Sequence, residues 1–94
     1  MNYATSFEVT RERADILESN PNAARVVTFI EDSVRLLREI GHGGFDSMLS
    51  AIAYHADQWS RCEPGMTVYR CGSHVAVHAR GARVLLIGER KVQA

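Results

Sequence analysis

The fold of this chain is decided by the stretch Met66-Thr-Val-Tyr-Arg-Cys-Gly-Ser-His-Val-Ala-Val-His-Ala-Arg-Gly-Ala-Arg-Val-Leu-Leu-Ile-Gly-Glu89. Three runs within it are rich in β-branched residues, and the pairs Gly72-Ser73 and Gly81-Ala82 separate them. A glycine at the first of two loop positions favours a type II′ hairpin turn, because that position needs a positive φ. The stretch therefore predicts a three-stranded antiparallel β-meander over residues 66–89.

Two-residue turns also fix which residues face each other across the strands. The first turn pairs Cys71 with His74, and the second is expected to pair Arg80 with Arg83 and His78 with Leu85. One side of the sheet, the expected core face, then carries Met66, Val68, Val75, Val77, Ala79, Val84 and Leu86, with Arg70 and Gly88 near its edge. The outer face is expected to carry Thr67, Tyr69, Cys71, His74, Ala76, His78, Arg80, Arg83, Leu85, Ile87 and Glu89. Such a mixture of apolar and polar residues is typical of a surface that another molecule covers.

Three helices are expected before the meander. Thr10 fits the N-cap of a short helix that runs to about Ser19. Asn20-Pro21 ends this helix and starts the second one, because proline is favoured at the first helical position. The second helix is predicted from apolar residues at three- and four-residue spacing, namely Val26, Val27, Ile30, Val34, Leu37 and Ile40.

The second helix has a wider apolar stripe than one contact needs, because Phe29 and Leu36 extend it. We therefore expect this helix to lie between the sheet and another element. Gly41-His-Gly-Gly44 predicts a C-cap and a chain reversal, and a third helix follows from Phe45 to Trp59. The order of elements predicts one α+β domain over residues 1–94, with a helical half (10–60) and a β-meander (66–89). Its three helices should pack on one face of the sheet.

Composition places the chain among ordinary globular proteins. Its 94 residues, 46% hydrophobic and 23% charged, are enough for one domain that folds without a metal or disulfide. The N-terminal residues lack the pattern of a secretory signal, and the longest uncharged apolar run, Val84 to Ile87, is too short to span a membrane. We therefore expect a cytoplasmic protein in which Cys62 and Cys71 are reduced thiols.

The net charge of zero hides an asymmetry between the two halves of the chain. Residues 1–60 contain five Arg and nine Asp or Glu, which gives −4, and residues 61–94 contain six Arg or Lys and two Glu, which gives +4. An acidic helical half is thus joined to a basic sheet half. A dipolar molecule of this kind can orient its sheet toward an acidic surface.

Metal binding is one interpretation of the potential ligands His55, Cys62, Cys71, His74 and His78. The spacing Cys71-x2-His74 resembles half of a zinc site. However, His74 and His78 lie four residues apart on one strand, roughly 13 Å at 3.3 Å per residue, and cannot share one ion if the strand is regular. We expect no bound metal and no cofactor, and a metal-binding module remains the third alternative.

The sequence does not predict an enzyme. No nucleophile elbow marks any serine or cysteine, and Gly41-His-Gly-Gly44 lacks the ending of a phosphate-binding P-loop. Asp46 and Asp57 lie eleven residues apart on the third helix, about 16 Å along its axis, which is too far for a paired-carboxylate mechanism.

Nucleic-acid binding is the second alternative. The third helix contains no Lys or Arg and carries two aspartates, so it cannot serve as a recognition helix. Only the sheet could contact phosphates, with Tyr69 as a stacking platform. The basic residues available for this are Arg61, Arg70, Arg80, Arg83, Arg90 and Lys91. The same arginines can instead keep an exposed sheet soluble and protect its edges.

The favoured interpretation is a small protein-interaction module that acts stoichiometrically as a regulator or inhibitor. Its expected contact residues are Tyr69, His74, His78, Arg80, Arg83, Leu85 and Ile87, an apolar centre with a polar rim. The partner would be another protein or a second copy of the chain in a homodimer. Alternatively, the N-terminal segment 3–9 folds over this patch and buries it. In general character, the small, motif-poor chain resembles accessory regulators and phage- or plasmid-encoded inhibitors.

Overall fold

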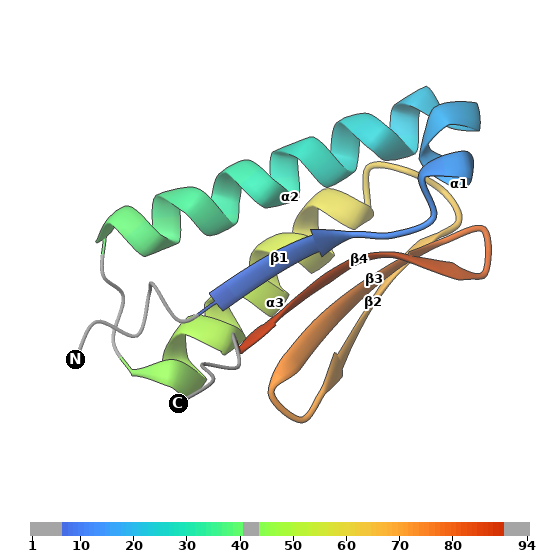
Figure 1. Ribbon diagram of the computed structural model, residues 1–94. Coiled ribbons are helices and arrows are strands. Elements are labelled where there is room, and N and C mark those ends of the chain that lie inside the picture. Colours follow the sequence, from blue (N-terminus) through green and yellow to red (C-terminus); the bar gives the residue numbers. More distant parts are fainter. Residues whose placement is uncertain (1–6, 41–43, 90–94) are drawn as a thin grey trace.

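The computed structural model describes residues 7–40 and 44–89 and has an α+β architecture. Its elements are β1 (Phe7–Arg11), α1 (Ala14–Ser19), α2 (Pro21–Ile40), α3 (Phe45–Ser60), β2 (Met66–Cys71), β3 (His74–Ala79) and β4 (Ala82–Glu89). The strands form one antiparallel sheet in the order β1-β4-β3-β2, and α2 and α3 lie on the same side of it (Figure 1). The predicted class and the three helices are confirmed, but the sheet has four strands where three were expected.

The additional strand is β1, which pairs antiparallel with β4 along its whole length, from Phe7 opposite Glu89 to Arg11 opposite Leu85. Its residues alternate in the way that a half-buried strand requires, because Phe7 is fully buried, Val9 is partly buried, and Glu8 and Thr10 are exposed. Since Thr10 lies in β1, the prediction that it caps a helix is wrong. The first helix begins at Ala14, after Arg13 in the left-handed conformation.

The first hairpin has the predicted register. Cys71 lies opposite His74, Tyr69 opposite Ala76, and Gly72 in the turn has a φ of 58°. The second hairpin differs from the prediction, because its two turn residues are Arg80 and Gly81 and not Gly81 and Ala82. Both have positive φ, 53° and 78°, which is the conformation of a type I′ turn.

This turn and a β-bulge next to it reverse the expected facing of β4. Ala79 pairs with Ala82 and His78 with Arg83, but the next pair is Val77 with Leu85, so that Val84 is the extra residue. Beyond the bulge every side chain of β4 lies on the face opposite to the predicted one. Leu85 and Ile87 are therefore fully buried in the core, and Leu86 lies on the outer face.

The energy balance explains why the chain adopts the strained turn. A positive φ at Arg80 costs on the order of 1–3 kcal/mol. The predicted register would have buried Leu86 and Gly88, whereas the observed one buries Leu85 and Ile87. The additional isoleucine contributes about 1.5–3 kcal/mol, because glycine has no side chain to remove from water.

The helices use the apolar stripes that the sequence predicts, with two differences. Pro21 starts α2 as expected, and its buried residues are Ala23, Val26, Val27, Ile30, Val34 and Leu37. Ile40, however, is 72% exposed, and α2 is not covered on its far side by any described element. The predicted C-cap and reversal at residues 41–43 lie outside the described residues, and Gly44 is the N-cap of α3.

One continuous core joins the helices to the sheet. Ile30 from α2, Ile52 from α3 and Val77 from β3 are each at most 1% exposed and belong to the same cluster. Within the described part of the chain, no helix is long and apolar enough to cross a membrane.

Candidate functional site: the outer face of the sheet

The outer face is the side of the sheet that carries no helix (Figure 1). The strand pairings arrange its residues in three rows across the strands. The strand pairings align Cys71, His74, Gly88 and Glu8 in the first row, and Tyr69, Ala76, Leu86 and Thr10 in the second. The third row contains Thr67, His78 and Arg83, and Arg83 bonds to Glu12. A largely apolar middle row thus lies between two polar rows.

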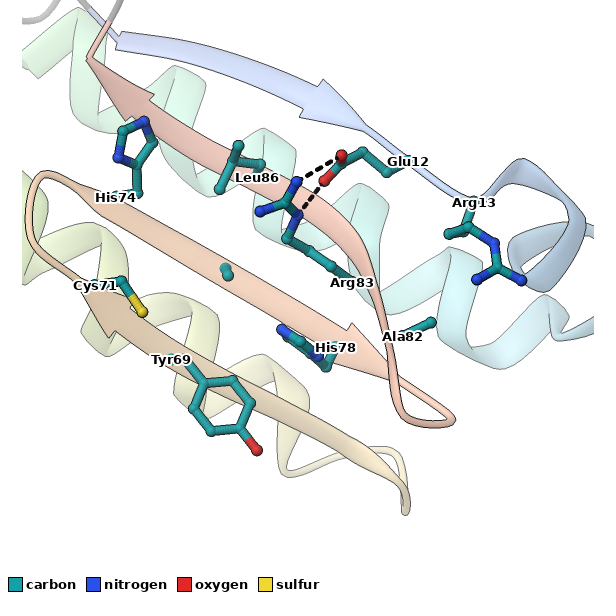
Figure 2. Close-up of a pocket in the computed structure, with 10 residues that line it drawn as sticks. Glu12, Arg13, Tyr69, Cys71, His74, His78, Ala82, Arg83 and Leu86 are labelled. Carbon is teal, nitrogen blue, oxygen red and sulfur yellow. Dashed lines mark hydrogen bonds and ion pairs between the residues drawn. The ribbon is translucent and has the colours of Figure 1, made fainter.

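A hollow of about 710 Å³ lies over these rows, and Figure 2 shows the side chains around it. They come from β2, β3, β4 and the segment after β1, so three strands and this segment contribute to one surface. The lining residues are Glu12, Arg13, Tyr69, Cys71, His74, Ala76, His78, Ala82, Arg83 and Leu86. The volume lies within the range of roughly 300–1,000 Å³ that is usual for ligand pockets.

The aromatic side of this hollow is built by Tyr69 and His78. Their rings meet edge to face, with the ring centroids 4.9 Å apart and the planes at 76°. This geometry places the positive ring edge against the negative face and holds both rings in place. Tyr69 is nevertheless 50% exposed, so much of its ring is free to contact a partner.

The opposite side of the hollow contains an ion pair between the segment after β1 and strand β4. Arg83 donates through Nε and Nη2 to the two carboxylate oxygens of Glu12, with Nη2 and Oε2 2.9 Å apart (Figure 2). These hydrogen bonds lower the pKa of Glu12 below its usual value and raise that of Arg83. The bidentate contact fixes both side chains at the rim of the hollow.

The first row is completed by His74, whose imidazole lies directly over Gly88. A Cβ built on Gly88 would be 2.0 Å from Cδ2 and 2.6 Å from Nε2 of this ring. The ring therefore fills the space that a side chain at position 88 would occupy, and an aromatic group of this kind can compensate for a glycine in a strand. Only glycine allows His74 to keep this position.

Gly88→Ala is expected to lower the free energy of unfolding by about 1–2 kcal/mol, because the new methyl group forces the His74 ring to move. In a double-mutant cycle measured by urea denaturation, His74→Ala should remove most of this cost. An equal cost of Gly88→Ala with and without the His74 ring would contradict the packing described here.

The predicted contact residues are only partly brought together. Tyr69, His74, His78 and Arg83 line the hollow, and Arg80 is exposed in the neighbouring turn. The placement of Leu85 and Ile87 on this face is wrong, because the bulge after His78 turns both into the core, where each is 0% exposed. Leu86 takes their place as the aliphatic residue of the outer face.

The basic residues proposed for nucleic-acid contact do not form one patch. Arg61 pairs with Asp57 at the end of α3, and Arg70 donates to Ser50 on the helical side of the sheet. Arg83 is neutralised by Glu12. The proposed residues Arg90 and Lys91 lie outside the described residues. The segment 3–9 was the alternative cover for this face; its residues 7–9 belong to strand β1 beside β4, and residues 3–6 lie outside the described residues.

The potential metal ligands are likewise separated. Cys71 and His74 lie opposite each other across the first turn, but His55 lies on α3 and Cys62 follows that helix. Among residues 7–40 and 44–89, no three His, Cys, Asp or Glu side chains come together to hold a metal ion. Cys62 and Cys71 are both free and exposed.

Four lining residues were not assigned to the outer face from the sequence: Glu12, Arg13, Ala82 and Leu86. The contact between Glu12 and Arg83 joins residues 71 positions apart, and no local pattern indicates it. For Leu86, a signal exists in the pair Arg80-Gly81, because glycine at the second loop position also permits a type I′ turn.

Comparisons with protein-family models, with curated proteins and with solved structures find no match to this chain.

Proposed function

We propose that this protein binds another protein through its outer sheet face and regulates or inhibits that partner stoichiometrically, by covering part of its surface. The observation that carries the proposal is the apolar middle row of Tyr69, Ala76 and Leu86 between two polar rows. An apolar centre with a polar rim is the usual anatomy of a protein interface.

The rigidity of the face supports the same proposal. Tyr69 packs against His78, Arg83 is held by Glu12, and His74 lies on Gly88. Side chains that are already ordered lose little conformational entropy when a partner binds, so more of the contact energy appears as affinity.

The side chains of the outer face also indicate what kind of partner surface would fit it. A single large side chain, aromatic or aliphatic, would fit between Tyr69 and Leu86. Arg80, beside the hollow, has no ion-pair partner within the described residues, and an acidic group of the partner could pair with it. The partner surface that fits best is therefore an apolar anchor flanked by a carboxylate.

The proposal is tested by affinity capture with immobilised protein, comparing wild type with Tyr69→Ala and Leu86→Glu. Truncation of a central anchor is expected to weaken binding by about 2 kcal/mol, roughly thirtyfold. Tyr54→Ala is the matched control, because Tyr54 is an equally large exposed ring, 62% exposed, on α3. A captured protein that is lost with the two sheet variants and kept with the control supports the proposal. A protein lost only with Tyr54→Ala overturns it.

A further inference from the structure

Helix α2 carries a stripe of large apolar side chains that the described elements leave partly or largely exposed. Phe29 is 38% exposed, Leu36 is 55% exposed and Ile40 is 72% exposed. Phe29 and Leu36 are seven residues apart, and Leu36 and Ile40 are four apart, so the three share one face of the helix. Apolar residues at this spacing are typical of a helix that packs against another helix.

The stripe continues onto α3 through Trp59. The rings of Phe29 and Trp59 stack with their centroids 4.7 Å apart, and Trp59 Nε1 donates to Ser33 Oγ at 3.0 Å. Ser33 in turn donates to the backbone carbonyl of Phe29 at 3.0 Å. The polar groups within the stripe therefore have partners already, and covering it with apolar side chains leaves none of them unsatisfied.

We propose that this stripe binds a second copy of the chain, with the two α2 helices antiparallel and a two-fold axis near Asp32 and Ser33. Positions 29 and 36 lie symmetrically about this point. The axis therefore places Phe29 of one copy against Leu36 of the other, and Leu36 of the first against Phe29 of the other. This makes the contact self-complementary, as a two-fold interface requires.

The charges beside the stripe fit the same arrangement. Arg25 and Glu39 lie seven residues before and after Asp32. An axis between Asp32 and Ser33 therefore brings Arg25 of one copy to within one residue of the position opposite Glu39 of the second copy, about 1.5 Å along the helix, and does so twice. Both side chains are exposed, and neither has an ion-pair partner within the described residues. Asp32, close to the axis, is neutralised by Arg35 at 2.9 Å, which limits repulsion between the two copies.

This pairing goes beyond the proposed function, because it uses the side of the molecule opposite the outer sheet face. The two helical layers would meet, and the two sheets would face outward. A dimer of this kind presents two outer faces, so it could bind two partner molecules or two sites on one assembly with increased avidity.

The test is the molar mass in solution, measured by sedimentation equilibrium across the micromolar concentration range. Wild type is expected to form a dimer, and Leu36→Arg is expected to weaken the association by about tenfold or more. Arg25→Glu and Glu39→Arg should each weaken it because they place like charges opposite each other. The double variant Arg25→Glu/Glu39→Arg should restore the association, because opposite charges then face each other again with their signs exchanged. Tyr69→Ala on the sheet is the control and should leave the mass unchanged.

Each other outcome overturns the inference. A monomeric wild type means that the stripe does not bind a second copy and that another protein or another segment of the chain covers it. A dimer that survives Leu36→Arg, or that is lost with Tyr69→Ala, forms through a different surface. Failure of the double charge reversal to recover the association contradicts the antiparallel register. None of these results bears on partner capture by the outer sheet face, so the two proposals fail independently.

Discussion

Leu85→Asp is expected to abolish cooperative folding, whereas Leu86→Asp should leave the protein folded. Leu85 is 0% exposed within the core, and an unpaired carboxylate there costs several kcal/mol against a total stability of about 5–15 kcal/mol. Leu86, the adjacent residue, lies on the outer face beside solvent. Urea denaturation followed by circular dichroism measures both effects.

The alanine variants give a graded form of the same test. Leu85→Ala should cost about 2–5 kcal/mol because it leaves a cavity in the core. Leu86→Ala should cost clearly less, because it leaves no enclosed cavity. If the larger loss occurred at Leu86, strand β4 would have the facing expected from a Gly81-Ala82 turn, and the bulge would be absent.

Phe7→Ala is expected to lower the free energy of unfolding by about 3–5 kcal/mol, the usual cost of removing a buried aromatic ring. The Phe7 ring is fully buried and stacks on Phe45, with the centroids 5.0 Å apart and the planes at 6°. It therefore joins strand β1 to the start of α3. Chemical denaturation of the purified variant measures the change.

The matched control for this prediction is Glu8→Ala, one residue further along the same strand and exposed. A surface substitution of this kind usually changes stability by less than about 0.5 kcal/mol. Similar small effects at both positions would mean that β1 contributes little to the folded state and that the sheet is in effect three-stranded.

The helices could be predicted well because their signals are local. Pro21 and the three- and four-residue spacing from Val26 to Leu37 define α2 without any knowledge of its neighbours. The exposure of Leu36 and Ile40 could not be predicted in this way. Whether an apolar side chain is covered depends on the tertiary arrangement, and the sequence pattern alone suggested a covering element that the described structure does not contain.

The sheet was predicted in part, and the two errors, the register of β4 and the missed strand β1, have different origins. The first hairpin is correct because Gly72 occupies the first position of its turn, as expected. Gly81 fits either the first position of a type II′ turn or the second of a type I′ turn, and the choice depends on which apolar residues the helices can bury. Strand β1 has only two apolar residues, Phe7 and Val9, too few for a clear alternation signal.

The residues of the candidate site were likewise predicted where their hairpin was predicted correctly and missed where it was not. Tyr69, His74 and His78 were placed correctly because the first hairpin was. Leu85 and Ile87 were predicted on the outer face, but the register of the second hairpin places Leu86 there and turns the other two into the core. Glu12 required the pairing of β1 with β4, which is set by distant packing and not by any motif.

The most direct test of the central proposal is cross-saturation transfer by nuclear magnetic resonance, from a captured, protonated partner to this protein labelled in its leucine, alanine and tyrosine side chains. If the partner binds the outer sheet face, the strongest signal loss is expected at Tyr69, Ala76 and Leu86, and little at the buried Leu85 or at Tyr54 on α3. Strongest losses at Tyr54 and Leu36, with Tyr69 and Leu86 unchanged, would show that the partner binds the helical side and not the outer sheet face.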